Sequence, residues 1–436
     1  MMELQTAMQV LPWALFALLG AFIVLGVPIA FALVLSSFAV ILLDPRLTPW
    51  ILFQRMYYGM DGFVLLAVPL FLLAGNLINA ARVTDRLIAF ALTIFGRFRG
   101  ALAQVNVFVS VLFGGVSGSS TADAAGVGTV LIPAMKREGY PAPFSVAVTA
   151  TSSVIGNIIP PSITMIVWGA VTSTSIGGLF FAGIVPGILI GIALIVLSAL
   201  LSRRYDVPVR EPASGREILA SSRDGLLALS IPVIVIGGIR YGWFSPTEAA
   251  VIAVLVSLFL GFVVYRTLTV GKVIVASGET ARLASLSLFS LVGASIFGYL
   301  ISFYRIPPML MEGFAIESPA LLLIAMAAVI LAVGTFMDAL PATAIVAPLF
   351  LPIALQAGIH PVHFGIVGIM ALGFGLVTPP YGLCLLIAAK IGGIPMLRAM
   401  GPTSVYLGVM LLVLLACILV PGIVLGLPRL IAPDLI

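Results

Sequence analysis

The chain has 436 residues, of which 61% are apolar and only 8% are charged. A soluble domain carries about 25% charged residues, so these few charges cannot cover a water-facing surface, which excludes a soluble enzyme, a nucleic-acid-binding protein and a disordered scaffold. The formal net charge of +5 is too small to indicate a polyanionic partner. The composition therefore predicts an all-α, polytopic membrane protein.

Apolar stretches follow one another along the chain, and a helix needs about 20 apolar residues to cross the hydrocarbon core of a bilayer. The stretches that are long enough lie at roughly 11–43, 62–81, 144–170, 176–201, 226–240 with 245–265, 283–304, 363–389 and 403–427. No Lys or Arg precedes the first of them, so we expect a retained membrane helix rather than a cleaved signal.

Two further stretches, at about 100–135 and 319–355, are apolar but interrupted by Gly, Pro, Ser and Asp. Basic residues cluster at 82–99, at Lys136-Arg137, over 203–223 and over 266–272. If all these clusters lie on the cytoplasmic side, the stretch 100–135 must enter from the cytoplasm and return there as a re-entrant hairpin. This topology predicts a cytoplasmic N-terminus and a C-terminus on the outside.

An internal repeat relates the two interrupted stretches. Pro133, Gly139 and Pro160-Pro161 recur 219 residues later as Pro352, Gly358 and Pro379-Pro380. The first copy's loop at 136–141 is basic, whereas the matching loop at 356–361 has no Lys or Arg, so we expect the two loops on opposite sides of the membrane. The sequence therefore predicts inverted repeats, residues 1–225 and 226–436, an arrangement typical of secondary transporters.

Each half also contains a pair of consecutive prolines inside an apolar span. Pro160-Pro161 interrupts 144–170, and Pro379-Pro380 interrupts 363–389. Each pair removes two backbone donors and disfavours the helical conformation of the preceding residue, and unpaired backbone at membrane depth persists only inside protein or beside a cavity. We expect two broken transmembrane helices, with a simple proline kink as the alternative.

The interrupted stretches are expected to turn near 114–123 and 334–343, where small and hydroxyl residues surround one carboxylate each. Freed carbonyls with Ser, Thr and Asn oxygens form a cage suited to Na⁺, and half-helix N-termini suit an anion. The alternative role of the small residues is close helix packing. Asp123 and Asp338 are costly inside a membrane. We expect them to cap or stabilise the hairpins, with ion ligation as the alternative.

Motifs for catalysis are missing from the sequence, which has no GxxxxGK[ST], no HExxH and no GxSxG. His360 and His363 lie in one loop far from the serine cluster, so no nucleophile has a basic partner. Cys384 and Cys417 lie in apolar stretches, which is typical of inert buried thiols. We therefore predict that the protein is not an enzyme and holds no organic cofactor.

The sequence resembles the large, DctM-like membrane subunit of tripartite ATP-independent periplasmic (TRAP) transporters, in order and over nearly the whole chain. The motifs that carry this resemblance are Val68–Gly75 (VPLFLLAG), Ser117–Asp123 (SGSSTAD), Gly156–Ser162 (GNIIPPS), Ser245–Ala250 (SPTEAA) and Gly375–Gly382 (GLVTPPYG). One departure is Asn157, where many members of the family have Pro.

The resemblance implies a Na⁺-driven importer of the bacterial cytoplasmic membrane, with an elevator-type transport domain like that of the wider ion-transporter architecture. It implies two partners, a small four-helix membrane subunit and a periplasmic substrate-binding protein, and a periplasmic C-terminus. The substrate class it implies is an organic acid, such as a C4-dicarboxylate, sialic acid, a keto acid or a sugar acid.

The family's site residues map onto the hairpin turns and the breaks. The implied Na⁺ ligands are Ser117, Ser119, Gly156, Asn157, Gly334, Thr335, Gly375 and Thr378. The implied substrate-binding residues are Ser120, Thr121, Asn157, Pro160, Thr378, Pro379 and Tyr381. The alternative function is a self-sufficient Na⁺- or H⁺-coupled organic anion symporter without partner subunits. An intramembrane enzyme and a purely structural subunit fit the two polar breaks less well.

Overall fold

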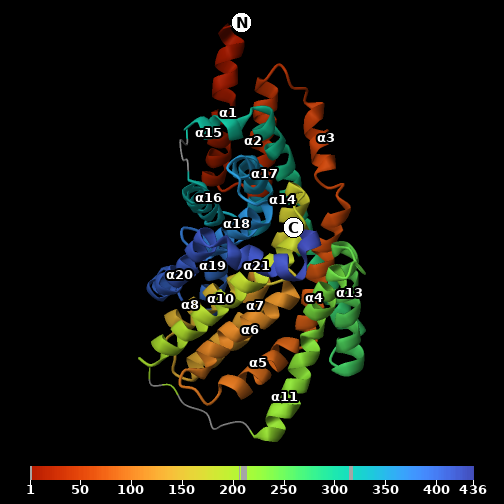
Figure 1. Ribbon diagram of the computed structural model, residues 1–436, viewed down its shortest axis with the longest axis vertical. Helices are drawn as coiled ribbons and strands as arrows, with labels where there is room; N and C mark the ends of the chain where they lie inside the picture. The colour runs from red at the N-terminus through yellow and green to blue at the C-terminus, as the bar shows by residue number, and fades with distance from the viewer. Residues whose placement is uncertain (1, 206, 208–213, 314–317) are drawn as a thin grey trace.

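The computed structural model describes residues 2–205, 207, 214–313 and 318–436. Over these ranges every regular element is a helix (Figure 1). Within the same ranges, six helices are long and apolar enough to cross a membrane, or seven if the bent pair formed by α11 (Gly215–Ala228) and α12 (Ser230–Arg240) is one span. The predicted all-α membrane class is confirmed.

The N-terminal elements are α1 (Met2–Val24), α2 (Ile29–Leu43), α3 (Trp50–Tyr58), the 3₁₀ turn η1 (Phe63–Leu66), α4 (Ala67–Ala80) and α5 (Val83–Phe95). The prediction of one apolar span at 11–43 is wrong, because a turn separates α1 from α2. Gly26 adopts a φ of 79°, which a residue with a Cβ rarely adopts, and Pro28 cannot continue a helix from the turn before it.

The first interrupted stretch forms two helices, α6 (Ala101–Ser117) and α7 (Ser120–Arg137). Asn106 contacts Met135 and Ser110 contacts Asp123, so the two helices run antiparallel as a hairpin. The elements that follow are α8 (Ala142–Ser153), the 3₁₀ turn η2 (Val154–Asn157), α9 (Ile163–Thr172) and α10 (Ile176–Ser202).

The middle of the chain contains α13 (Pro246–Phe259), its π-helical continuation η3 (Leu260–Val264), α14 (Val270–Phe303) and α15 (Ile306–Gly313). α14 has 34 residues and begins well before the predicted start at 283. Thr269 caps it, because its hydroxyl accepts a hydrogen bond from the N–H of Lys272 at 3.3 Å. The first turns of α14 carry charged residues, which is why hydropathy alone does not predict them.

The second half repeats the order of the first. Its elements are α16 (Pro319–Gly334), α17 (Ala339–Gln356), α18 (Pro361–Gly375), α19 (Leu383–Gly392), α20 (Met396–Leu419), α21 (Pro421–Ile431) and the 3₁₀ turn η4 (Pro433–Leu435). α7 and α17 begin 219 residues apart, as do α8 and α18. The Pro160-Pro161 and Pro379-Pro380 bonds are both cis. The predicted apolar span 403–427 is divided at Pro421 between α20 and α21.

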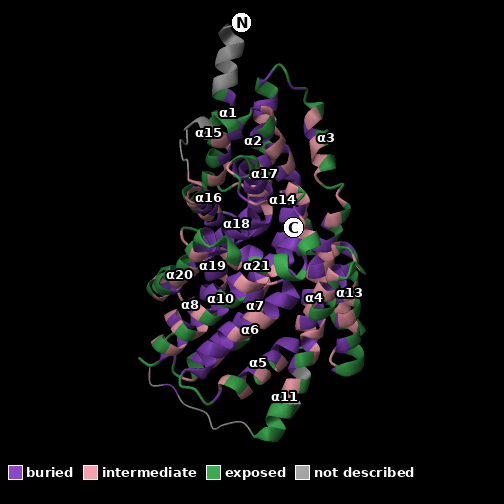
Figure 2. Cartoon of the chain, in the orientation of Figure 1, coloured by how far each residue is buried: buried purple, intermediate pink, exposed green. Residues whose placement is uncertain are grey.

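The helices α6–α9 and α16–α19, here called the hairpin body, pack together. α7 contacts α8 and α19, α17 contacts α9 and α18, and α16 contacts α18. Every residue of α18 from Val362 to Gly375 is buried, and Figure 2 shows α18 in purple. α2, α3 and α4 contact the long α14 instead, and with α5, α13 and α14 they are here called the flanking helices.

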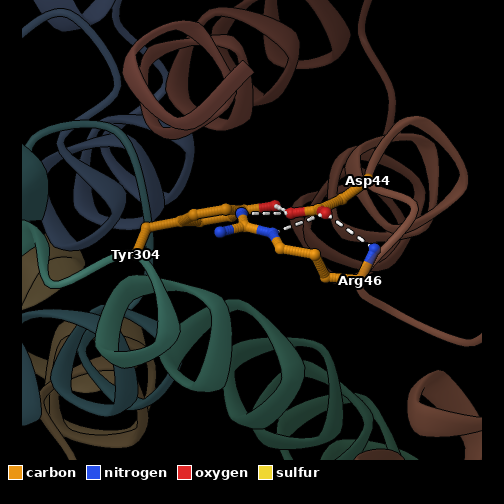
Figure 3. Close-up of polar contacts among 3 residues, drawn as sticks. All are labelled: Asp44, Arg46 and Tyr304. Atoms are coloured by element: carbon orange, nitrogen blue, oxygen red, sulfur yellow. Dashed lines mark hydrogen bonds and ion pairs between the residues drawn. The ribbon is translucent and has the colours of Figure 1, made fainter. Parts of the chain in front are cut away.

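An ion pair between Arg46 and the buried Asp44, with a hydrogen bond from Tyr304, joins the end of α14 to the end of α2 (Figure 3). The carboxylate of Asp44 accepts hydrogen bonds from Nε of Arg46 at 2.9 Å, from its Nη2 at 2.6 Å and from the hydroxyl of Tyr304 at 2.9 Å. The bonds from Arg46 hold the pKa of Asp44 below its usual range, and burial raises the pKa of Tyr304. The guanidinium also lies over the ring of Phe303, 5.1 Å from its centroid.

Candidate functional site

The first hairpin turns in two residues, Gly118 and Ser119. Gly118 ends α6 at a φ of 62°, and its N–H donates to the carbonyl of Gly114 at 2.9 Å. A Cβ at this position would lie 2.7 Å from the carbonyl oxygen of Pro161, so the turn requires glycine. Ser119 caps α7, with its hydroxyl accepting from the N–H of Ala122 at 3.4 Å.

This turn is hydrogen-bonded to the first break. The N–H of Ile163 donates to the carbonyl of Gly118 at 3.1 Å. The N–H of Ser120 donates to Oδ1 of Asn157 at 3.1 Å, and the hydroxyl of Ser120 donates to the carbonyl of Val154 at 3.3 Å. The hairpin turn and the broken helix therefore form one hydrogen-bonded unit.

The first break is more than a kink. Residues 158–162 are not helical, and α9 restarts at a new cap, Ser162. The hydroxyl of Ser162 donates to the carbonyl of Asn157 at 2.7 Å, which pairs a carbonyl that the break frees. A Cβ on Gly114 would lie 2.8 Å from Cα of Gly156, so α6 and the break are in backbone contact. The predicted broken helix is confirmed here, and again between α18 and α19.

The second hairpin and the second break are joined in the same way. The carbonyl of Thr335, which ends α16, accepts from the N–H of Tyr381 at 3.2 Å and from that of Gly382 at 3.3 Å. A Cβ on Gly375 would lie 2.6 Å from Cα of Gly334, so this pair also packs backbone to backbone. In both halves, the residue that ends the first hairpin helix accepts hydrogen bonds from the broken helix.

The two carboxylates occupy different positions. Asp338 is the N-cap of α17 and accepts from the N–H of Ala339 at 2.9 Å. Asp123 lies one turn inside α7 and does not cap it, because Ser119 does. Its Oδ1 accepts from the hydroxyl of Ser110 at 3.3 Å, and that hydroxyl is 3.1 Å from the hydroxyl of Ser152. Asp123 thus belongs to a buried polar network that ties α6, α7 and α8 together.

A cavity of about 970 Å³ lies where the first hairpin turn, the first break and the flanking helices meet. Of the predicted Na⁺ ligands and substrate residues, five line it, namely Ser117, Ser119, Ser120, Thr121 and Asn157. The second half contributes Asp338, Leu340 and Leu376. The N-termini of α7 and α17 both lie at this region. That of α7, capped by a neutral serine, favours an anion there, whereas Asp338 already places a carboxylate at that of α17.

The other predicted site residues do not line this cavity. They are Gly156, Pro160, Gly334, Thr335, Gly375, Thr378, Pro379 and Tyr381. The hydroxyl of Thr378 donates its proton to the carbonyl of Phe374 at 2.8 Å. The lone pairs of this oxygen remain available as acceptors. The side chain of Tyr381 is half exposed.

The flanking helices supply polar residues that the sequence reasoning missed. Asn76 and Asn79 of α4, Arg82 and Glu279 line the same cavity as the hairpin turn. Nδ2 of Asn76 donates to the hydroxyl of Thr280 at 2.8 Å, which joins α4 to α14 across 204 residues of sequence. Two asparagines three positions apart, on one face of an otherwise apolar helix, were the available signal. Such residues are costly in a membrane unless they face a polar space.

Three buried polar atoms around this site have no hydrogen-bond partner among the described residues. They are the hydroxyl of Ser117, Oδ2 of Asp123 and Nδ2 of Asn157. Asn157 is only 3% exposed, and its Oδ1 already accepts a hydrogen bond from the N–H of Ser120. The group of this side chain that is left without a partner is therefore the donor, Nδ2. Buried groups are normally paired. Of these three residues, Ser117 and Asn157 line the cavity, whereas Asp123 does not.

Residues 16–423 match the family of the tripartite ATP-independent periplasmic transporter, DctM component. The chain is 39% identical to the sialic acid TRAP transporter large permease protein SiaM of Vibrio cholerae, over 85% of this chain and 87% of that one. It is 36% identical to the C4-dicarboxylate TRAP transporter large permease protein DctM of Pseudomonas aeruginosa, over 86% and 88%.

Two further proteins are similar to this chain, one in sequence and one in fold. The isethionate TRAP transporter permease protein DctMQ of Oleidesulfovibrio alaskensis is 35% identical over 94% of this chain, which covers 65% of that longer protein. The solved structure of the Alcanivorax borkumensis YdaH transporter is similar in fold, with a TM-score of 0.59 over 94% of this chain and 97% of that one, at 17% identity. Because the family match covers residues 16–423, the chain belongs to the DctM family of TRAP transporter large permeases. Its relatives and its apolar helices make it a multi-pass protein of the inner membrane.

Proposed function

We propose that this large permease is the transporting subunit of a Na⁺-coupled importer that brings an organic acid across the cytoplasmic membrane. The observation that carries the proposal is the cavity of about 970 Å³, in which two helix N-termini, unpaired polar atoms and the broken backbone meet. A cavity with these features offers an anion its donors and a cation its oxygens in one place.

For Na⁺ we propose two groups of ligands, one in each half. The first consists of Ser117, Ser119, Gly156 and Asn157, and the second of Gly334, Thr335, Gly375 and Thr378. The unpaired hydroxyl of Ser117 and the free lone pairs on the hydroxyl of Thr378 support these groups. Hard oxygen ligands of this kind suit Na⁺ better than a transition metal.

For the substrate we propose Ser120, Thr121 and Asn157, which line the cavity beside the N-terminus of α7. The free Nδ2 of Asn157 is a donor, so it fits a carboxylate of the substrate better than it fits a cation. The relatives named for sialic acid, C4-dicarboxylates and isethionate all bear the names of anionic substrates, which supports an organic acid here. Pro160, Thr378, Pro379 and Tyr381 lie away from the cavity and are left out of this set.

We further propose an elevator mechanism, in which the hairpin body moves against the flanking helices. The residues 1–225 and 226–436 would be inverted repeats, with α6–α7 and α16–α17 as re-entrant hairpins. The matching start positions of α7 and α17 and the matching contacts of the two turns support a repeat. In this scheme the N-terminus is cytoplasmic and the C-terminus periplasmic.

Thiol labelling tests the inverted topology. Arg137 and Gln356 end α7 and α17, the equivalent hairpin helices, and both side chains are exposed. Single cysteines at these two positions, in a chain without Cys384 and Cys417, should react with an impermeant reagent from opposite faces of the membrane. Reaction from the same face would contradict the inverted repeat.

The partners we propose are a small four-helix membrane subunit and a periplasmic substrate-binding protein. The relative DctMQ extends well beyond the part that this chain matches, which supports a small membrane subunit as a partner. Uptake by proteoliposomes holding both membrane subunits, screened over organic acids with an inward Na⁺ gradient, tests the proposal. Uptake should require the binding protein; equal uptake by this chain alone would instead establish the self-sufficient symporter.

A further inference from the structure

A second cavity, of about 460 Å³, lies further along α14, between α3, α9, α14 and α17. Two of its lining residues, Ala344 and Pro348, come 219 residues after Ala125 and Thr129, which line the first cavity. The long α14 lines both cavities, the first through 279–287 and the second through 291–302. The second cavity therefore touches the same face of the second hairpin that the first cavity touches on the first.

Arg55 is the one charged side chain among the described residues that line this cavity. Its guanidinium lies over the ring of Tyr299, 4.0 Å from the centroid. No Asp or Glu in the described part of the chain forms an ion pair with it. Stacking covers one face of the guanidinium and leaves its N–H edges open, and those edges match the two oxygens of a carboxylate or a phosphate.

Close packing fixes the position of Arg55. A Cβ on Gly59, one helical turn further along α3, would lie 2.6 Å from Cβ of Ser295, so α3 and α14 are in direct contact. The carbonyl of Arg55 accepts a hydrogen bond from the hydroxyl of Ser295 at 3.2 Å. The charge is thus held at the cavity wall by its own helix, although no acidic residue balances it.

We propose that the second cavity is an oxyanion site in which Arg55 holds a carboxylate of the transported acid, further along α14 than the first cavity. The identity of this ligand rests on the function proposed above. A guanidinium without an acidic partner attracts anions and repels cations. The second cavity occupies the position that the 219-residue repeat makes equivalent to the first cavity, and Arg55 places its charge there. A phospholipid phosphate would offer the guanidinium the same kind of oxygens as a carboxylate. A lipid could reach this cavity, because α3 carries exposed aromatic residues that suit a membrane interface, Trp50, Phe53 and Tyr57.

Reactivity of one cysteine tests the charge selection without any transport. Ser302 lines the cavity and is exposed, so Ser302→Cys can be made in a chain lacking Cys384 and Cys417 and assembled with the small membrane subunit. An anionic and a cationic methanethiosulfonate are compared, each normalised to free cysteine. We expect the anionic reagent to be favoured about tenfold. Arg55→Gln should remove that preference, and Arg55→Lys should keep it.

Arg398→Gln is the matched control, because Arg398 is an exposed arginine on α20, which does not line the cavity. It should leave the preference unchanged. Equal rates for the two reagents in the parent, no labelling by either, or an unchanged preference in Arg55→Gln would each overturn the proposal.

The source of the anion is decided in nanodiscs of neutral phosphatidylcholine and of phosphatidylglycerol, with succinate and inorganic phosphate as probes. Slower labelling with succinate in the neutral discs supports the transported acid. Slower labelling caused only by phosphatidylglycerol assigns the site to a lipid headgroup and overturns the assignment to substrate. Because labelling needs no turnover, its result does not depend on the outcome of the test of Na⁺-coupled uptake.

In uptake assays, Arg55→Gln should raise the substrate KM about tenfold and leave the apparent Na⁺ affinity unchanged.

Discussion

Asn157→Asp, compared with Asn157→Leu, is expected to separate the binding of substrate by Nδ2 of Asn157 from the binding of Na⁺ by its Oδ1. In the parent, Oδ1 accepts the N–H of Ser120 at 3.1 Å and Nδ2 has no partner among the described residues. Leucine removes both polar atoms and leaves the N–H of Ser120 unpaired at a residue that is 1% exposed. An unsatisfied buried donor costs about 1–3 kcal/mol, or roughly 5- to 150-fold in an equilibrium constant.

Aspartate changes only one of the two contacts. It keeps an acceptor for the N–H of Ser120 but turns a negative oxygen toward the place that the amide N–H₂ occupies. At about 4 Å and an effective dielectric constant of about 20, two like charges repel by about 4 kcal/mol. Asn157→Asp should therefore weaken substrate binding more than Asn157→Leu does, and its apparent Na⁺ affinity should be equal to the parent's or higher.

The assay is uptake by proteoliposomes, with substrate varied at saturating Na⁺ and Na⁺ varied at saturating substrate. The melting temperature of the purified complex shows that each variant assembles. Ser257→Ala is the control, because this buried hydroxyl bonds to the carbonyl of Ala253 within α13 and lies away from the cavity. If Asn157→Asp keeps a substrate KM within about twofold of the parent, far below the expected penalty, then Nδ2 does not face the substrate.

Three further changes test other parts of the structure. Thr378→Val keeps the shape of the side chain but removes its oxygen, and it should lower the apparent Na⁺ affinity about tenfold; an unchanged Na⁺ dependence would remove Thr378 from the site. Gly375→Ala should abolish uptake and lower the melting temperature, because its Cβ would lie 2.6 Å from Cα of Gly334, whereas Gly401→Ala has open space and should be silent. Asp44→Asn should cost about 1–3 kcal/mol at pH 7. Because the pKa of Asp44 is lowered in the folded protein, this loss should shrink as the pH falls below about 4, and melting curves that keep the full difference there would refute the ion pair's role.

The breaks and the hairpins could be predicted because their causes are local. Two adjacent prolines cannot continue a helix from the turn before them, so 160–161 and 379–380, in the middle of long apolar stretches, mark breaks by themselves. The division at Gly26 was missed because the residues around it are apolar enough to hide a turn from a hydropathy average. The early start of α14 was missed for the opposite reason, since its first turns are charged.

The cavity could be predicted only in part, because half of its wall comes from distant sequence. The motif around Ser120 and Asn157 is recognisable within one half, and the structure joins these residues by a hydrogen bond. The contributions of Asn79 and Glu279 depend on how α4 and α14 lie against the hairpin turn, and no local pattern determines that. The sequence left open whether Asp123 caps α7 or stabilises the hairpin, because that depends on which residue adopts the extended conformation of a cap, and in the structure Ser119 does.

The most direct test of the central claim is the accumulation of substrate at steady state as a function of the Na⁺ gradient. Proteoliposomes with both membrane subunits are held without ATP, at equal pH on both sides, with substrate-loaded binding protein outside. The account predicts that accumulation rises with the inward Na⁺ gradient and disappears when a Na⁺ ionophore collapses it. Accumulation that persists without Na⁺, or that follows an imposed proton gradient instead, would contradict it.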